Sequence, residues 1–173
     1  MPTIGVAVAL PEPWASQLQD YRASMGDRTA AQIPTHITLI PPVEVEAERL
    51  GEVEAHLATV AAQVDAFWIH LRGTGTFRPV SPVVFVAVVE GISQCEQLAD
   101  AVRCGPLSVE LTFPYHPHVT VAHHLHDALL DLAFSELADF DCEFAADRFS
   151  LYVHDPANGW RPTREFELQP VRV

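Results

Sequence analysis

The chain has 173 residues, of which 49% are hydrophobic, and its formal net charge at pH 7 is −13. The hydrophobic fraction excludes a disordered chain, and the length suits one domain, residues 1–173, with a sizeable core. All ten basic residues are arginines, and an acidic protein binds long RNA or DNA poorly. We therefore expect no long nucleic acid as a partner, although a small nucleotide or a short RNA end could bind where arginines gather.

Three further features bear on the cellular compartment. No apolar run approaches the length of a transmembrane helix, so we expect no membrane partner. The apolar start, residues 3–10, has no basic residues before it and runs into prolines, which favours a first strand over a signal peptide. The cysteines Cys95, Cys104 and Cys142 are odd in number and lack metal or redox spacing. These features predict a reduced, cytoplasmic protein, and we also expect a monomer.

Hydrophobic periodicity predicts alternating strands and helices along the first half of the chain. Strands are expected at 3–10, 36–40 and 67–71, and helices at 13–25 and 47–64. We expect Pro41 and Pro42 to stop the second strand. Gly73-Thr74-Gly75 is expected to form a turn after the third strand.

The second half repeats this order. Strands are expected at 83–89, 119–122, 142–154 and 164–168, helices at 91–105 and 127–140, and a turn at 155–159. No stretch is typical of an interdomain linker. The repeat predicts an α+β fold of two pseudo-symmetric lobes, with sheets inside and helices outside.

The two halves also share a short motif inside an apolar, β-branched run. It reads His36-Ile37-Thr38-Leu39 in the first half and His118-Val119-Thr120-Val121 in the second, 82 positions later. Side chains alternate along a strand, so each histidine shares a face with its threonine. A histidine transfers protons near neutral pH, and a hydroxyl donates to an anionic oxygen. Two such pairs facing each other could act on both ends of a reacting phosphodiester; the alternative is surface histidines beside ordinary strand threonines.

On these motifs the chain resembles the two-histidine (2H) phosphoesterases, a group that includes the 2′-5′ RNA ligases and the RNA 2′,3′-cyclic phosphodiesterases. The resemblance covers nearly the whole chain. Supporting segments are Gly73-Thr74-Gly75-Thr76-Phe77, Pro114-Tyr115-His116-Pro117, Leu151-Tyr152-Val153 and Trp160-Arg161-Pro162. It implies two mainly antiparallel sheets that face a central cleft in which the motifs meet.

The resemblance also implies hydrolysis of a 2′,3′-cyclic phosphate, or of a related 2′-5′ linkage, in a nucleotide or short RNA end. It suggests that His118 activates water and that His36 protonates the leaving oxygen, an order that the sequence alone does not fix. Thr38 and Thr120 would donate hydrogen bonds to nonbridging phosphate oxygens. This chemistry needs no metal or other cofactor, and we expect none.

Several residues near the motifs are candidates for substrate binding. Phe77, Tyr115, Tyr152 and Trp160 could stack on a base, or could instead belong to the core. Arg78, at the mouth of a strand, could hold a phosphate, or be a solvated surface arginine. A basic residue soon after the second motif, common in RNA-directed relatives, is absent here, which argues against a tRNA-sized substrate.

Two other functions stay open. A metal-dependent hydrolase could draw its ligands from a histidine cluster, namely His116, His118, His123, His124, His126 and His154. Successive histidines on a strand alternate faces, and no His-Glu-x-x-His pattern is present, so this reading is disfavoured. The chain could also bind a nucleotide without cleaving it, but a pure binder needs no pair of proton-transfer groups.

Overall fold

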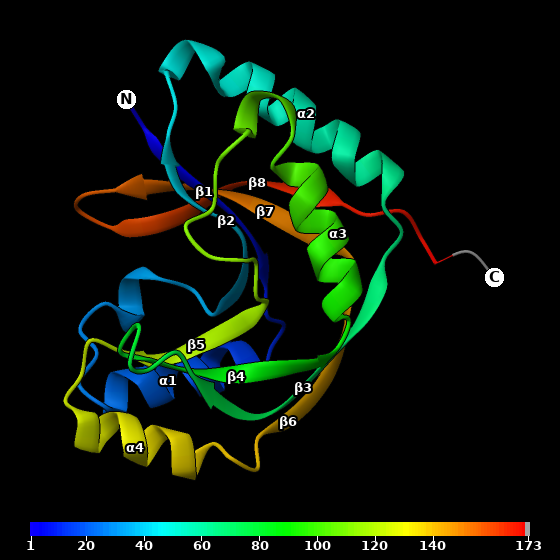
Figure 1. Ribbon diagram of the computed structural model, residues 1–173. Helices are drawn as coiled ribbons and strands as arrows, with labels where there is room; N and C mark the ends of the chain where they lie inside the picture. Colours follow the sequence, from blue (N-terminus) through cyan, green and yellow to red (C-terminus); the bar gives the residue numbers. More distant parts are fainter. Residues whose placement is uncertain (172–173) are drawn as a thin grey trace.

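The apolar strands of the chain pair into two separate sheets, described in a computed structural model over residues 1–171 (Figure 1). The strands are β1 (Thr3–Ala9), β2 (His36–Glu44), β3 (Phe67–Thr76), β4 (Val83–Glu90), β5 (His118–His123), β6 (Asp141–Ala146), β7 (Arg148–Asp155) and β8 (Gly159–Glu167). The α-helices are α1 (Trp14–Ser24), α2 (Leu50–Gln63), α3 (Ile92–Val102) and α4 (Asp127–Glu136). Short 3-10 helices lie in the connections at η1 (Ala30–Gln32), η2 (Ala47–Arg49) and η3 (Gly105–Leu107).

The two sheets are built alike. One has the strand order β2-β1-β7-β8 and the other β5-β4-β3-β6, and neighbouring strands are antiparallel throughout. The strands that carry the motifs, β2 and β5, occupy matching edges of their sheets. Their paired positions are Ala9 with His36 and Ala7 with Thr38, and Ala87 with His118 and Phe85 with Thr120. The predicted α+β fold with two duplicated antiparallel sheets is confirmed.

The helices cover the outer faces of the sheets. If each half of the chain formed one lobe, each helix would pack on the sheet of its own half, but the observed arrangement differs. In Figure 1, α2 and α3 cover the sheet of β1, β2, β7 and β8, while α1 and α4 cover the other sheet. Thus α1, which follows β1, packs against β5, and α3, which follows β4, packs against β2. Each lobe therefore contains segments from both halves of the chain. Over residues 1–171, the helices are too short or too polar to cross a bilayer.

The same burial pattern anchors both motif strands. His36 and Thr38 are half-buried, and so are His118 and Thr120. The apolar side chains between them are completely buried: Ile37, Leu39, Val119 and Val121. Each such side chain contributes about 1.5–3 kcal/mol of hydrophobic stabilisation, so the core fixes which face carries the histidines.

The prediction that Pro41 and Pro42 end the second strand is wrong, because β2 continues to Glu44. Its register with β1 shifts at this point, so that Ile40 and Val43 are paired while the two prolines between them are not. Since β2 is an edge strand and the prolines lie at an irregularity, no ladder hydrogen bond is lost there.

The predicted turn at Gly73-Thr74-Gly75 is also wrong. β3 runs through it to Thr76, and its register with β4 shifts between Leu71 and Thr74. The glycines therefore mark a β-bulge inside a long strand rather than a reversal of the chain.

The single strand predicted at 142–154 is two strands in different sheets. β6 ends at Ala146 and pairs with β3, whereas β7 begins at Arg148 and pairs with β1 and β8. Apolar side chains continue across the junction because both strands face buried regions. β8 starts at Gly159 rather than at the predicted residue 164. The predicted start is too late because the first half of β8 is largely exposed and lacks the apolar alternation that marks a strand.

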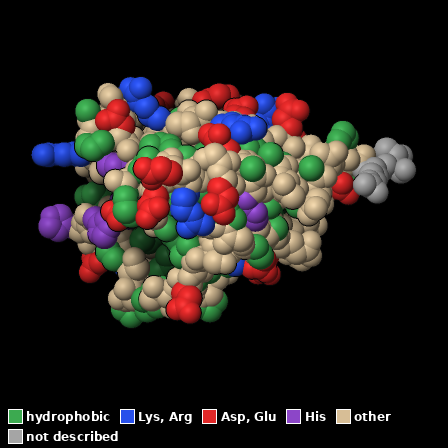
Figure 2. All heavy atoms as spheres, turned by 90° about the horizontal axis from the view of Figure 1, so that it is seen from above, with side chains coloured by type: hydrophobic (Ala, Val, Ile, Leu, Met, Phe, Trp, Pro, Cys, Tyr) green, Lys and Arg blue, Asp and Glu red, His purple; other side chains and the backbone are tan. Residues whose placement is uncertain are grey.

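A buried ion pair lies where the end of α1 meets the second sheet. Arg22 donates to the carboxylate of Asp27 at 2.7 Å, and their side chains are 3% and 5% exposed. His123 on β5 places its Nδ1 3.6 Å from the same carboxylate. Burial raises the pKa of Asp27, but hydrogen bonds from Thr29 and Arg22 outweigh it and hold that pKa below its ordinary value. Elsewhere, Figure 2 shows acidic and basic side chains intermixed over one face of the molecule.

We expect Arg22→Met to lower the free energy of unfolding by about 3–5 kcal/mol, because it leaves a buried carboxylate without its cation. Arg49→Met, which breaks the exposed pair with Glu52, is the matched control and should change stability far less. Urea denaturation of both variants measures the difference. Equal losses would contradict the assigned role of the buried pair.

Candidate active site

The two motif histidines have the same local geometry. The Nδ1 atom of His36 lies 2.5 Å from the carbonyl oxygen of Pro34, and that of His118 lies 2.7 Å from the carbonyl oxygen of His116. A carbonyl oxygen only accepts, so Nδ1 carries the proton and donates in both rings. Each ring therefore keeps Nε2 for proton transfer.

The two motifs converge at Thr38. Its carbonyl oxygen accepts a 2.7 Å hydrogen bond from the hydroxyl of Tyr115, which ties the segment before β5 to β2. Thr38 lines one pocket together with His36 and a second pocket together with His118. β2 and β5, from different sheets, contact each other directly. Histidines 82 positions apart thus flank one central threonine.

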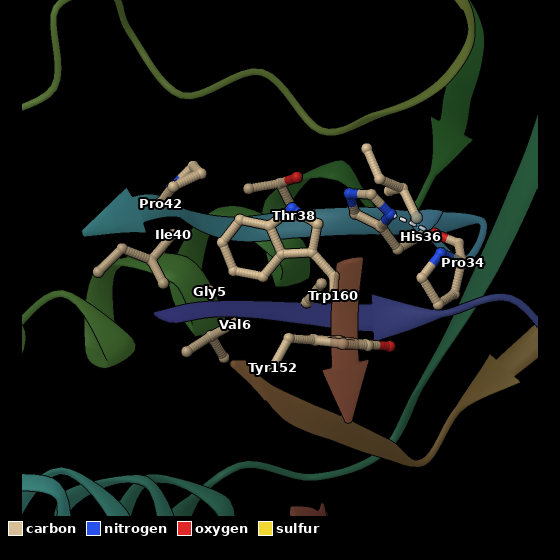
Figure 3. Close-up of a pocket in the computed structure, with 11 residues that line it drawn as sticks. Gly5, Val6, Pro34, His36, Thr38, Ile40, Pro42, Tyr152 and Trp160 are labelled. Atoms are coloured by element: carbon tan, nitrogen blue, oxygen red, sulfur yellow. Dashed lines mark hydrogen bonds between the residues drawn. The ribbon is translucent and has the colours of Figure 1, made fainter. Parts of the chain in front are cut away.

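The pocket beside His36 is narrow, with a volume of about 180 Å³ (the narrow pocket). Figure 3 shows His36 and Thr38 side by side on β2, with the free nitrogen of His36 on the side of Thr38. The indole of Trp160 lies over Gly5, where an added Cβ would be 3.5 Å from the ring. Tyr152 also lines this pocket, so two aromatic side chains form part of its wall.

The hairpin of β7 and β8 positions these aromatic side chains. Its turn is held by Asp155, which accepts hydrogen bonds from the backbone N–H of Ala157 and the side-chain amide of Asn158. Gly159 follows with φ +80°, and a Cβ there would clash with Gln32, so only glycine fits. This close approach packs the hairpin against the segment leading to His36.

The pocket beside His118 is wider, with a volume of about 560 Å³ (the wide pocket). His118 stands edge-on to Phe77 at 4.9 Å between ring centroids and lies 5.3 Å from Phe85. Phe85 in turn lies 4.6 Å from Phe77 and covers Gly75, where a Cβ would be 2.5 Å from its ring. Glycine at this position thus lets Phe85 pack beneath the imidazole and fix its orientation.

Burial lowers the pKa of both histidines. For His36, the positive charge of Arg22 adds to this effect, and the hydrogen bond to Pro34 opposes it. For His118, the charges of His116 and His36 add to it, and the hydrogen bond to the backbone of His116 opposes it. Both imidazoles therefore favour the neutral form in the free protein, and protonation of one disfavours protonation of the other.

The sequence-predicted substrate-binding residues divide between the two pockets. Tyr152 and Trp160 line the narrow pocket, and Phe77 and Tyr115 line the wide one. Phe85 was not identified from the sequence as a residue of the site, because it lies in an apolar run typical of a buried strand. The pairing of this strand with the second motif strand is seen only in the sheet.

Two other predicted residues lie outside the lining of both pockets. The guanidinium of Arg78 donates to Asp131 on α4 at 2.8 Å, which offsets its charge. This placement does not support the predicted contact with phosphate. Thr120 is half-buried opposite Phe85, and its part in binding phosphate stays a prediction.

The histidine-rich segment does not assemble a cluster of ligands. Within residues 1–171, no three or more His, Cys, Asp or Glu side chains are grouped so as to hold a metal ion. His123 faces the buried carboxylate of Asp27 and lies 4.9 Å from the ring of His124. The alternative of a metal-dependent hydrolase at these histidines gains no support from this arrangement.

Residues 10–158 match the sequence profile of the 2′-5′ RNA ligase superfamily. The chain belongs to this superfamily. It is 31% identical over 138 residues to an Oceanobacillus iheyensis protein named "Putative phosphoesterase", covering 79% of this chain and 81% of that one. A Bacillus cytotoxicus protein of the same description is 31% identical over 140 residues, covering 80% and 81%. The resemblance inferred from the two His-x-Thr motifs is confirmed.

Solved structures of other proteins share the fold. Escherichia coli LigT in its apo form superposes with a TM-score of 0.70 at 21% identity, covering 98% of this chain and 99% of LigT. TT0787 of Thermus thermophilus gives a TM-score of 0.72 at 23% identity, covering 99% and 100%. The two-sheet architecture is therefore that of LigT-like proteins.

We expect His36→Asn to raise the pKa of His118, because it removes a neighbouring positive charge that lowers it. A pH titration of the ring C–H signals by NMR measures this shift. His126→Asn, at an exposed position, is the control and should leave the titration of His118 unchanged. An unchanged pKa in His36→Asn would mean that the two rings do not share one site.

Proposed function

We propose that this superfamily member is a metal-independent phosphodiesterase that hydrolyses a 2′,3′-cyclic phosphate, or a related 2′-5′ phosphodiester, of a nucleotide or short RNA end. The observation that carries the proposal is the matched pair of histidines on either side of Thr38. Each has Nδ1 bound to a backbone carbonyl and Nε2 available. This is the arrangement that acid–base catalysis at a single phosphorus atom requires.

In the proposed hydrolysis, neutral His118 takes a proton from water through Nε2 while the water oxygen attacks phosphorus. Protonated His36 gives its Nε2 proton to the departing sugar oxygen as the ester bond breaks. One P–O bond forms, one breaks, and the product is a phosphomonoester. The histidines finish with exchanged protonation states, which proton exchange with solvent restores. In the reverse reaction the two residues exchange roles.

The threonine hydroxyls are assigned to charge stabilisation. Thr38, at the junction of the two pockets, would donate to a nonbridging phosphate oxygen, and Thr120 is proposed to do so from the other strand. Donors fixed in advance on a strand stabilise the charge that builds on these oxygens in the transition state. Because the pockets are largely apolar, such hydrogen bonds are stronger there than in water.

A nucleotide ligand is supported by the site and by the solved relatives. Escherichia coli LigT has been solved in complexes with 3′-AMP and with ATP. In the present chain, Trp160 and Tyr152 both line the narrow pocket and offer aromatic rings on which a planar base could stack. We therefore assign the base of the nucleotide to the narrow pocket.

His36→Ala and His118→Ala should each reduce turnover about 10²–10⁴-fold, since each removes one proton-transfer group. Thr38→Val should lose less, because it removes one neutral hydrogen bond, and His126→Ala is the control expected to retain full activity. The assay is product identification after incubation with the four nucleoside 2′,3′-cyclic monophosphates and a 2′-5′ dinucleotide, with a chelator present. Full turnover in both alanine variants would refute the mechanism, and binding without product over hours would favour a non-catalytic binder.

The dependence of kcat/KM on pH should be bell-shaped, with its maximum below about pH 6.5, the ordinary pKa of histidine. Activity rises with pH as His118 loses its proton and falls as His36 loses its own, and the pKa of both is lowered in the free protein. The bound phosphate anion stabilises protonated His36, so the descending limb of kcat should lie at higher pH than that of kcat/KM. A maximum of kcat/KM above pH 8 would contradict this assignment.

A further inference from the structure

The two pockets that meet at Thr38 are unequal in size. The narrow pocket, at about 180 Å³, suits a single planar ring. The wide pocket, at about 560 Å³, lies within the range of about 300–1,000 Å³ that drug-sized ligands fill. Because His118 lines the wide pocket, a group seated there would lie beside the reacting phosphate. A nucleobase in the narrow pocket leaves the larger volume to another part of the substrate.

The wide pocket is bounded by apolar side chains held at the surface. Phe113 is 64% exposed and Val80 is 70% exposed, and both line this pocket beside Phe77 and Tyr115. Apolar area kept in contact with water is unfavourable and is covered when an apolar group binds. The wall of the pocket thus favours an apolar or aromatic occupant.

Positive charge is scarce at this site. Among the described residues that line either pocket, none is arginine or lysine, and the exposed acidic residue Glu110 is one of those that line the wide pocket. Three arginines near the site are paired with carboxylates, namely Arg22 with Asp27, Arg78 with Asp131 and Arg103 with Asp100. The intermixed acidic and basic side chains in Figure 2 are in keeping with such pairing. A second phosphate in the wide pocket would face Glu110 without a guanidinium to neutralise it.

We propose that the substrate carries its only negative charge at the scissile phosphodiester and bears a bulky, uncharged, apolar or aromatic group that fills the wide pocket. This inference rests on the proposed function and narrows its substrate class. Nucleotides with further phosphates, and RNA chains, are poor substrates, because their extra charge meets Glu110 and apolar walls. Selectivity is set by Phe113 and Glu110 rather than by the residues that transfer protons.

Three substrates with the same scissile bond test the proposal: adenosine 2′,3′-cyclic phosphate, its 5′-O-benzoyl derivative and its 5′-phosphate derivative. Relative to the parent, we expect kcat/KM to be about tenfold higher or more for the benzoyl derivative, from apolar burial. We expect it to be about tenfold lower or more for the 5′-phosphate derivative, from charge repulsion.

Two variants connect these preferences to the wide pocket. Phe113→Ala should lower the ratio of kcat/KM between the benzoyl derivative and the parent. Glu110→Gln should raise the ratio between the 5′-phosphate derivative and the parent. Phe134→Ala, at an exposed position on α4 outside the pocket, is the matched control and should keep both wild-type ratios.

The outcomes separate this inference from the proposed function. Cleavage of all three substrates, with the 5′-phosphate derivative as good as the parent or better, would overturn the inference and leave the proposed function standing. Equal values for the benzoyl derivative and the parent would overturn the assignment of the wide pocket. If none of the three were cleaved, the proposed function would fail, and the inference with it.

Discussion

The proposed chemistry of this protein depends on the strand register that the core imposes on β2 and β5. Buried Ile37 and Leu39 fix one strand, and buried Val119 and Val121 fix the other. A slip of one residue would turn the imidazoles into the core and the aliphatic side chains into the cleft. Pairing with β1 and β4 adds a second constraint, since each histidine lies opposite an alanine. Hydrophobic burial, a non-specific force, thereby sets the direction of the two histidines that we propose to be catalytic.

Partial burial of the two histidines also prepares their protonation states. Desolvation disfavours the charged imidazole, and the proximity of the rings disfavours two charges at once. In the proposed mechanism, a bound phosphate anion would favour the state in which one of the two histidines is protonated, which is the state that acid–base catalysis uses. The carbonyl hydrogen bonds at Nδ1 hold both rings in one tautomer throughout, so the proton is exchanged only at Nε2.

The duplicated α+β architecture could be predicted from the sequence because it depends on local periodicity, and the family could be predicted from the resemblance that the two motifs carry. Strand alternation at His36 and His118 already indicates which side chains share a face. Non-local features could not be predicted in this way. The packing of α1 and α3 on opposite sheets and the division of 142–154 between two sheets arise from pairing between distant segments. For the same reason, the sequence did not reveal that Phe85 packs beneath His118 or that Arg78 pairs with Asp131.

A crystal structure with a nucleoside–vanadate complex, which mimics the five-coordinate phosphorus of the transition state, tests the central claim most directly. The account predicts that Nε2 of His36 and Nε2 of His118 each lie about 2.6–3.2 Å from one of the two apical oxygens, on opposite sides of the vanadium. The hydroxyl of Thr38 should donate to an equatorial oxygen. Vanadate bound away from Thr38, or either imidazole turned from the apical oxygens, would contradict the account.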